Sequence, residues 1–268
     1  MFKVTLTGAL RTARYFNQHN VAASISYLPR ELNEQYKIDK EVEEYSRVLQ
    51  EISLNGLNSD LTVKLQQFGI LKDPQLTLSA LEILAQRAKA RKNFIWIDME
   101  RSHTVEDTIK IFEQLHDEFG NVGICLQAYL QRTREDLARV LERQAPVRLV
   151  KGFYNDGDIT DWGEVTDNYR SLMYELLSSK SKRPCIATHD LELIGEAKHE
   201  IKQEKVENAE LQFFKGVRDD LAIELSEEGY KIRIYVPYGH LWGYLVDGFR
   251  IFDNRRHIQR LFRRKNII

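Results

Sequence analysis

Charged and polar side chains occur at the ends of short apolar runs in this sequence. The run 147–154, VRLVKGFY, carries Arg148 and Lys151 and ends on Gly152 and two aromatic residues. Charged side chains are rarely buried without partners, so cations in such a run predict a site for an anionic or electron-rich ligand. Comparable residues at the ends of the other runs are Lys64, Asp98, Glu100, Gln127, Thr188, His189, Asp190, Gln212, Lys215, Tyr235 and Tyr238.

Two chemistries fit such a set of residues. A lysine at a strand end can form a Schiff base with a carbonyl substrate. Alternatively, Arg, Lys and Gln side chains can stabilise the negative charge of a reduced flavin. The spacing of the residues does not decide between the two.

Alternation along the strand 147–154 predicts which of its side chains share a face. Arg148 and Tyr154 share one face, so we expect both to point toward a ligand and Arg148 to contribute little to the core. Lys151 then lies on the opposite face, or in the following loop if the strand ends early. Gly152 has no side chain and would let a flat ligand approach the backbone closely.

The elements that must position these residues alternate between strand and helix. Apolar, β-rich runs occur at 21–28, 61–65, 93–99, 122–130, 147–154, 185–190, 209–216 and 231–239. Helical patterns follow them, because apolar residues recur three or four positions apart. Helix caps are expected at Asp39, at Ser102 or Thr104, at Thr133 and at Asp219.

Eight β/α units in succession predict a single α/β domain over residues 1–268, a distorted (β/α)8 TIM-like barrel. Residues 1–20 are expected to form an extra helix or a cover for the bottom of the barrel, and residues 240–268 the last helix. A doubly wound sheet is the rival fold, but the sequence has no GxGxxG motif. The active site of such a barrel lies at the carboxyl ends of its strands.

Composition and charge limit the classes of partner and compartment. The chain has 268 residues and a net charge of −1, which gives no overall attraction to nucleic acid. Cys125 and Cys185 lie in apolar runs and predict reduced core thiols, and no CxxC or HExxH metal motif occurs. The N-terminal apolar run is short and broken, and no apolar run is long enough to cross a membrane, so we expect a cytoplasmic protein.

The basic C-terminal stretch RRHIQRLFRRKNII is amphipathic. Such a helix can lie on anionic lipid, which would make the protein peripheral at the inner face of the membrane. A solvated helix end, whose cations suit the helix dipole, is the favoured alternative.

Six segments between residues 60 and 245 carry a family resemblance: LTVKL, IWIDME, RLVKGFY, CIATHD, LQFFKGV and IYVPYG. Together and in this order they resemble the flavin-dependent proline dehydrogenase family. The resemblance implies a distorted barrel that holds FAD and acts in proline catabolism. It implies oxidation of L-proline to 1-pyrroline-5-carboxylate by hydride transfer to flavin N5, with a quinone as the electron acceptor.

The resemblance also assigns roles by position. It implies that five residues are catalytic, with Arg148 near the reactive edge of the flavin: Lys64, Asp98, Arg148, Tyr154 and Tyr235. It implies that Leu149 walls the substrate pocket beside Lys64, Asp98, Tyr154 and Tyr235. It implies FAD contacts for Gln127, Arg148, Val150, Lys151, Gly152, Thr188 and His189.

The sequence departs from the family in its last helix. The family pattern YLxRRLxEN supplies two arginines that clamp the substrate carboxylate. Here Tyr244 matches, but Asp247 and Gly248 stand at the arginine positions, and Arg250 lies one helical turn from Asp247. An aspartate at this place would repel a carboxylate. Tyr244, Asp247 and Arg250 are therefore candidate substrate contacts of uncertain selectivity.

Four hypotheses remain at this point. The protein oxidises proline through rearranged arginines, or it performs the same flavin chemistry on a different cyclic or secondary amine. The third is a non-catalytic barrel that binds a flavin or another metabolite, and the fourth is a barrel enzyme that works through a Schiff-base lysine.

Overall fold

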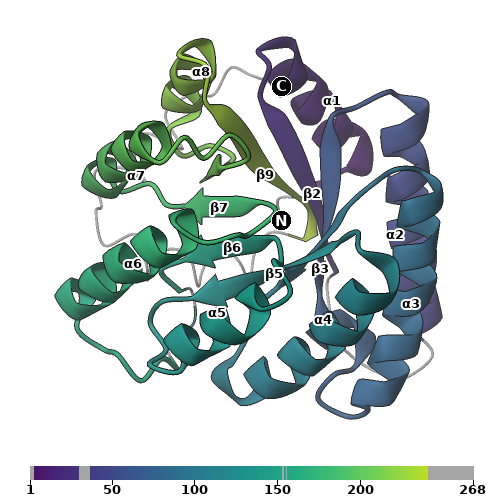
Figure 1. The fold of residues 1–268 in the computed structure, drawn as a ribbon. Helices are drawn as coiled ribbons and strands as arrows, with labels where there is room; N and C mark the ends of the chain where they lie inside the picture. Colours follow the sequence, from purple (N-terminus) through teal and green to yellow (C-terminus); the bar gives the residue numbers. More distant parts are fainter. Residues whose placement is uncertain (1–2, 30–36, 153, 155, 241–268) are drawn as a thin grey trace.

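The structure is a computed structural model that describes residues 3–29, 37–152, 154 and 156–240. Its 9-stranded sheet consists of a short antiparallel strand β1 (Lys3–Val4) and the parallel strands β2 to β9. Strand β9 pairs with both β8 and β2, so the parallel strands close into a barrel (Figure 1). The predicted (β/α)8 fold is confirmed.

The parallel strands follow the order in which they occur along the chain. They are β2 (Ala22–Leu28), β3 (Ser59–Lys64), β4 (Ile95–Asp98), β5 (Val122–Gln127), β6 (Val147–Val150), β7 (Pro184–Ala187), β8 (Glu210–Phe214) and β9 (Lys231–His240). Each overlaps a predicted run, but β6 and β7 contain only half of theirs, and several strands end earlier than the run does. Because β6 ends at Val150, Lys151 and Gly152 belong to the loop that follows it.

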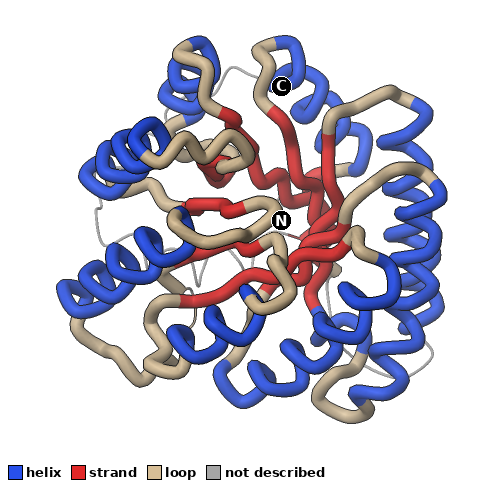
Figure 2. The backbone as a smooth tube through the Cα atoms, viewed as in Figure 1, coloured by secondary structure: helices blue, strands red, loops and turns tan. Residues whose placement is uncertain are grey.

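The helices surround the barrel as an outer ring (Figure 2). They are α1 (Leu6–Gln18), α2 (Lys37–Leu54), α3 (Pro74–Ala90), α4 (Val105–Phe119), α5 (Thr133–Leu141), α6 (Trp162–Leu177), α7 (Leu191–Gln203) and α8 (Asp219–Glu227), with 3-10 turns η1 (Leu65–Phe68) and η2 (Ser102–Thr104). Helix α1 packs against β2 and β9, so the N-terminal segment is an extra helix of the outer wall. The predicted last helix lies outside the described residues, among which no helix is long and apolar enough to cross a bilayer.

Most of the expected helix caps are wrong by a few residues. Asp39, Thr133 and Asp219 lie inside the first turn of their helices, and Thr104 is the N-cap of α4 without a side-chain capping bond. Side-chain caps occur instead at Thr5, Asp73, Asp161 and Asp190. Backbone geometry at the helix start, which composition does not specify, decides which polar residue caps.

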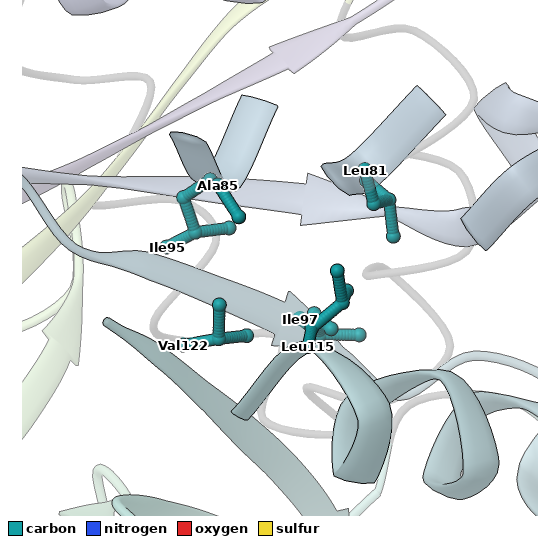
Figure 3. Close-up of a pocket in the computed structure, with 6 residues that line it drawn as sticks. All are labelled: Leu81, Ala85, Ile95, Ile97, Leu115 and Val122. Carbon is teal, nitrogen blue, oxygen red and sulfur yellow. The ribbon is translucent and has the colours of Figure 1, made fainter. Parts of the chain in front are cut away.

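The strand faces that point outward carry the apolar core. Between β4, β5 and the helices α3 and α4, the side chains of Leu81, Ala85, Ile95, Ile97, Leu115 and Val122 meet around a gap too small for a water molecule (Figure 3). Cys125 and Cys185 are free buried thiols, as predicted. The layer between strands and helices is therefore packing, without space for a ligand at this place.

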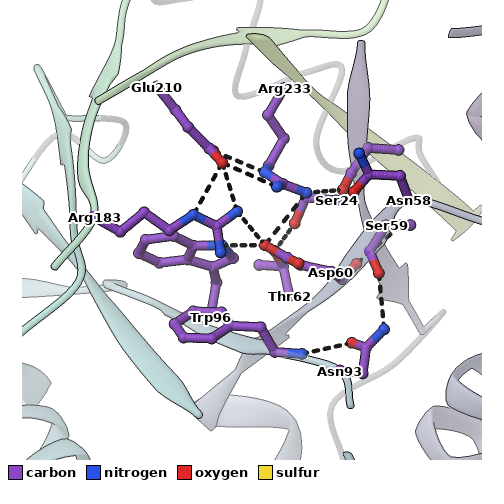
Figure 4. A network of polar contacts seen from close by, with 12 residues as sticks. Ser24, Asn58, Ser59, Asp60, Thr62, Asn93, Trp96, Arg183, Glu210 and Arg233 are labelled. Atoms are coloured by element: carbon purple, nitrogen blue, oxygen red, sulfur yellow. Dashed lines mark hydrogen bonds and ion pairs between the residues drawn. The ribbon is translucent and has the colours of Figure 1, made fainter. Parts of the chain in front are cut away.

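The inward faces of the strands are polar. At the amino-terminal end of the barrel, the side chains of Arg183, Arg233, Asp60 and Glu210 form a neutral network of ion pairs beside Trp96 (Figure 4). The Trp96 indole N–H donates to Asp60 at 2.9 Å, and the Arg183 guanidinium lies 5.2 Å from a Trp96 ring centroid. This network closes the end of the barrel opposite the expected active site.

Candidate active site

The centre of the candidate site is the carboxylate of Asp98, the last residue of β4. Lys64 Nζ at the end of β3 donates to its Oδ2 atom at 2.7 Å, and Tyr235 OH of β9 donates to the same atom at 3.1 Å. Arg148 Nη1 of β6 donates to Oδ1 at 3.0 Å. Residues from four strands that are far apart in sequence therefore share one carboxylate, as their strand-end positions predicted.

Arg148 lies deeper in the barrel than the sequence suggested. Its side chain is 3% exposed, its Nε donates to Gln212 at 2.7 Å, and its guanidinium lies 4.7 Å from a Trp96 ring centroid. The expectation that Arg148 contributes little to the core is wrong, because the inward faces of the strands are themselves closely packed. Its guanidinium shares the Asp98 carboxylate with the Lys64 ammonium, so one negative charge faces two positive charges inside the protein.

Lys64 is held as an ammonium group. Burial acts to lower its pKa, but the Asp98 carboxylate and neighbouring groups outweigh burial and place the pKa well above its ordinary value. A lysine must lose its proton before it can attack a carbonyl. The electrostatics of the site therefore disfavour the Schiff-base alternative.

The tyrosines of the site stay protonated at neutral pH. Burial raises the pKa of Tyr154 to about 12, although the nearby Lys64 ammonium opposes the shift. Burial and the Asp98 carboxylate raise the pKa of Tyr235 further, and its ring stacks on Phe214 at 5.2 Å. Both phenols therefore keep their protons, and that of Tyr235 is donated to Asp98.

Glu100, to which the sequence assigned no role, is also part of the site. Its carboxylate is 4% exposed and accepts a hydrogen bond of 2.8 Å from the backbone N–H of Gln66 in η1. Burial raises its pKa to about 7, against the opposing effect of Lys64. Its position two residues after Asp98 was the available signal.

A second group of polar residues lies at the ends of β5, β6 and β7. Lys151 Nζ donates to Thr166 at 2.9 Å and to Asp190 at 3.0 Å, which links the loop after β6 to α6 and α7. His189 Nε2 accepts from the backbone N–H of Phe214 at 2.8 Å, and Thr188 accepts from that of Asp190. This group lies next to the Asp98 centre, because the strands β4, β5 and β6 are neighbours in the sheet.

The proline dehydrogenase family model matches residues 9–246 of the chain. The chain belongs to the proline dehydrogenase family. Proline dehydrogenase 1 of Bacillus subtilis (strain 168) is 30% identical over 242 residues, which are 89% of this chain and 80% of that protein. The proline dehydrogenase of Deinococcus radiodurans is 28% identical over 263 residues, covering 94% of this chain and 84% of that protein.

Solved structures show the same fold. Proline utilization A from Bdellovibrio bacteriovorus, inactivated by N-propargylglycine, superposes with a TM-score of 0.84 at 19% identity, over 94% of this chain and 32% of that one. Its counterpart from Corynebacterium freiburgense gives 0.80 at 19% identity, over 97% and 32%. The chain thus spans about a third of these longer proteins. Family membership confirms the predicted class, an oxidoreductase of the proline dehydrogenase type, for which a flavin cofactor is implied.

The described residues of this proline dehydrogenase family member fit a flavin. Gln127 donates through Nε2 to the Met99 carbonyl at 3.2 Å, while its Oε1 atom is buried without a partner among the described residues. A buried acceptor without a donor is costly unless a ligand supplies one. Lys151 keeps 22% of its side chain exposed, so its cation remains accessible to an anionic part of a cofactor.

Not every residue expected to contact substrate or FAD is brought to the Asp98 centre. Leu149 is fully buried on the face of β6 opposite Arg148, and its carbonyl accepts from Tyr169 of α6, so the structure does not bring it to the Asp98 centre. Val150, half-buried at the end of β6, pairs with Gln127. Tyr244, Asp247 and Arg250 lie outside the described residues.

The structure shows a packing reason for the glycine at position 152. A Cβ atom on Gly152 or on Gly157 would overlap the ring of Tyr129, and Gly152 has a φ of +133°. The Tyr129 hydroxyl donates to Asp156 at 2.9 Å, and Asp156 also accepts from the backbone N–H of Ser102 at 2.8 Å. Tyr129 thus packs against Gly152 and Gly157 and, through Asp156, is linked to Ser102 in the segment after β4.

Proposed function

We propose that this protein is an FAD-dependent dehydrogenase that oxidises L-proline to 1-pyrroline-5-carboxylate and passes the electrons to a quinone. A bound flavin supplies the hydride acceptor, its N5 atom. Family membership supports the proposal. The single observation that carries it is the Asp98 carboxylate, which receives hydrogen bonds from Lys64, Arg148 and Tyr235 at the active-site end of the barrel.

The residues of the Asp98 centre have different roles in the proposed reaction. Lys64 and Asp98 form a buried pair of fixed charges that can orient a cyclic amine, and Tyr154 and Tyr235 keep their hydroxyl protons to donate. Arg148 holds a permanent positive charge beside them, which stabilises negative charge that develops nearby during the reaction. Preorganisation of these groups avoids the cost of reorienting them in the transition state.

The second polar group would hold the cofactor. The unpartnered Gln127 oxygen needs a donor, the Lys151 ammonium can meet a phosphate, and Thr188 and His189 stand at the neighbouring strand end. Val150 and Gly152 provide backbone at the same edge. No cysteine or histidine in a known flavin-attachment motif is present in the sequence, so we propose that FAD binds non-covalently.

The test is anaerobic reduction. The purified protein is titrated with L-proline while the flavin absorbance is followed, and a soluble ubiquinone analogue is then added. We expect bleaching by proline, recovery with the quinone, and a loss of bleaching rate in Lys64→Met. Lys180→Met, an exposed lysine at the opposite end of the barrel, is the control and should behave as wild type.

Other outcomes of this titration would support the alternative functions. Bleaching by pyrrolidine but not by proline would favour a different cyclic amine, which Asp247 and Gly248 at the arginine positions support. A flavin that stays oxidised with every amine would mean a non-catalytic binding barrel. A protein that takes up no flavin on incubation with FAD would contradict the proposal altogether.

We further propose that the protein acts in the cytoplasm and reaches its quinone acceptor at the inner face of the membrane. The basic stretch at residues 255–268, which lies outside the described residues, supports peripheral contact. Co-sedimentation with phosphatidylglycerol vesicles tests this, and equal recovery with neutral phosphatidylcholine vesicles would contradict it.

A further inference from the structure

A substrate that carries a carboxylate needs a cation whose donors are available. Arg148 is poorly suited to this role, because its side chain is buried and three of its five N–H groups already donate to Gln212, Asp98 and Ser24. Lys64 is hydrogen-bonded to Asp98 in the same buried cluster. The cations of the Asp98 centre are thus committed to protein acceptors.

Arg101 differs from them. It follows Glu100 in the loop after β4, its side chain is exposed, and its guanidinium carbon lies 5.3 Å from the centroid of the Tyr154 ring. Among the described residues, no carboxylate lies within ion-pair distance of this guanidinium. The neighbouring acids are engaged elsewhere, since Glu100 accepts from Gln66 N–H and Asp156 from Ser102 N–H.

Tyr154 connects Arg101 to the Asp98 centre. Tyr154 is partly buried, and the charges of Lys64, Glu100, Asp98 and Arg101 all act on the pKa of its phenol. A guanidinium stacked on an aromatic face keeps its in-plane N–H groups free, and these match the two oxygens of a carboxylate. The stack therefore presents a carboxylate-binding edge next to the residues proposed to orient the amine.

The backbone at Arg101 is fixed as well. Its carbonyl accepts from the Thr104 N–H at 2.9 Å and from the Thr104 hydroxyl at 2.8 Å, and Asp156 holds the next residue, Ser102. A fixed backbone reduces the entropy lost when the side chain engages a ligand.

We propose that Arg101, stacked on Tyr154, binds the carboxylate of the substrate and takes the place of a paired-arginine clamp. This inference rests on the proposed function, since it assumes an amino-acid substrate at the Asp98 centre. It also resolves the conflict in the sequence, where Asp247 and Gly248 occupy the positions of that clamp. Arg101 is then a specificity-determining residue for carboxylated cyclic amines.

The experiment compares a carboxylate with a neutral ligand of similar shape. Binding of tetrahydro-2-furoate and of tetrahydrofurfuryl alcohol to the FAD-loaded protein is measured from flavin absorbance changes in wild type, Arg101→Ala and Arg101→Lys. We expect Arg101→Ala to weaken tetrahydro-2-furoate binding about 10- to 100-fold and Arg101→Lys to weaken it less, because one ammonium replaces a bidentate pair. Alcohol binding, FAD content and melting temperature should not change.

Arg91→Ala is the matched control, since Arg91 is an exposed arginine at the end of α3 on the opposite side of the barrel. If Arg101→Ala binds tetrahydro-2-furoate with wild-type affinity, the inference is overturned. The proposed function still stands in that case, provided that proline reduces the flavin. An equal loss of both ligands would also overturn it, because Arg101 would then only shape the pocket. Failure of wild type itself to bind tetrahydro-2-furoate or to be reduced by proline would overturn the proposed function.

Discussion

Replacing Glu210 by Gln would remove one charge from the ion-pair network at the amino-terminal end of the barrel (Figure 4). Arg233 donates to Glu210 through Nε at 2.9 Å and through Nη2 at 3.0 Å, and Arg183 Nε donates at 3.0 Å. Burial acts to raise the pKa of Glu210, but the two guanidinium groups outweigh it and hold the pKa far below its ordinary value.

The expected cost follows from the burial of all partners. Removing one partner of a buried ion pair costs about 3–5 kcal/mol, because the remaining charge loses its compensation in a region of low dielectric. After the change, Arg183 and Arg233 would share only the Asp60 carboxylate. Glutamine preserves the side-chain volume and one acceptor oxygen, so no cavity contributes to this loss.

The pH dependence has a defined sign. The pKa of Glu210 is lower in the folded state, so its contribution is present above the unfolded pKa of about 4.3 and is lost as the pH falls toward the folded pKa. The stability difference between wild type and Glu210→Gln should therefore be largest near neutral pH and shrink below about pH 4.

Urea unfolding followed by tryptophan fluorescence measures the effect, at pH 7 and again at pH 3.5. The control is Glu175→Gln, which removes the exposed ion pair with Arg134 and should cost about 0–1 kcal/mol. The reasoning is refuted if Glu210→Gln costs less than about 1 kcal/mol at pH 7, or if its cost grows as the pH falls.

Three further predictions concern the active-site end. The raised pKa of Glu100, about 7, means that the stability of the folded protein falls as the pH rises from about 4.5 through 7. Glu100→Gln should remove this dependence of the melting temperature on pH, and an unchanged dependence would contradict the raised pKa. Gly157→Ala should lower the melting temperature by several degrees because of the clash with Tyr129, and the same change should lower it much less in a Tyr129→Ala background. If the two losses of melting temperature simply add, the clash is not the cause. Lys151→Met should weaken FAD affinity about tenfold in a fluorescence titration without altering the fold, whereas wild-type affinity would remove Lys151 from the cofactor site.

The sequence was sufficient to predict the architecture. Eight apolar β-rich runs followed by amphipathic patterns favoured a closed barrel, and the absence of a GxGxxG motif disfavoured the rival doubly wound sheet. The polar ends of those runs then located Lys64, Asp98 and Tyr235, because the carboxyl ends of parallel strands meet at one face of the barrel. Local pattern and connectivity were enough for these conclusions.

The network around Glu210 was missed, although a signal was present. Glu210 and Arg233 alternate with apolar residues inside predicted strand runs, and Asp60 directly precedes such a run in the same alternation, which marks inward-facing polar positions. Their charges alone do not reveal that they meet, since Asp60 and Arg233 are separated by most of the chain. Strand register around the closed barrel brings them together.

Register and packing also decided the details of the site. Local composition identified Arg148 and Gly152 as candidates, and the family resemblance added Leu149. However, β6 ends at Val150, and the pairing of β6 with its neighbours places Arg148 in the interior and Leu149 on the outer face. Gly152 is required by Tyr129, which lies more than twenty positions earlier in the chain. Sequence determined which residue types stand at the strand ends, because these follow from local pattern. Tertiary structure alone decided which charges neutralise one another and which, like that of Arg101, are left for a ligand, because ion pairing depends on distances across the barrel that no local pattern encodes.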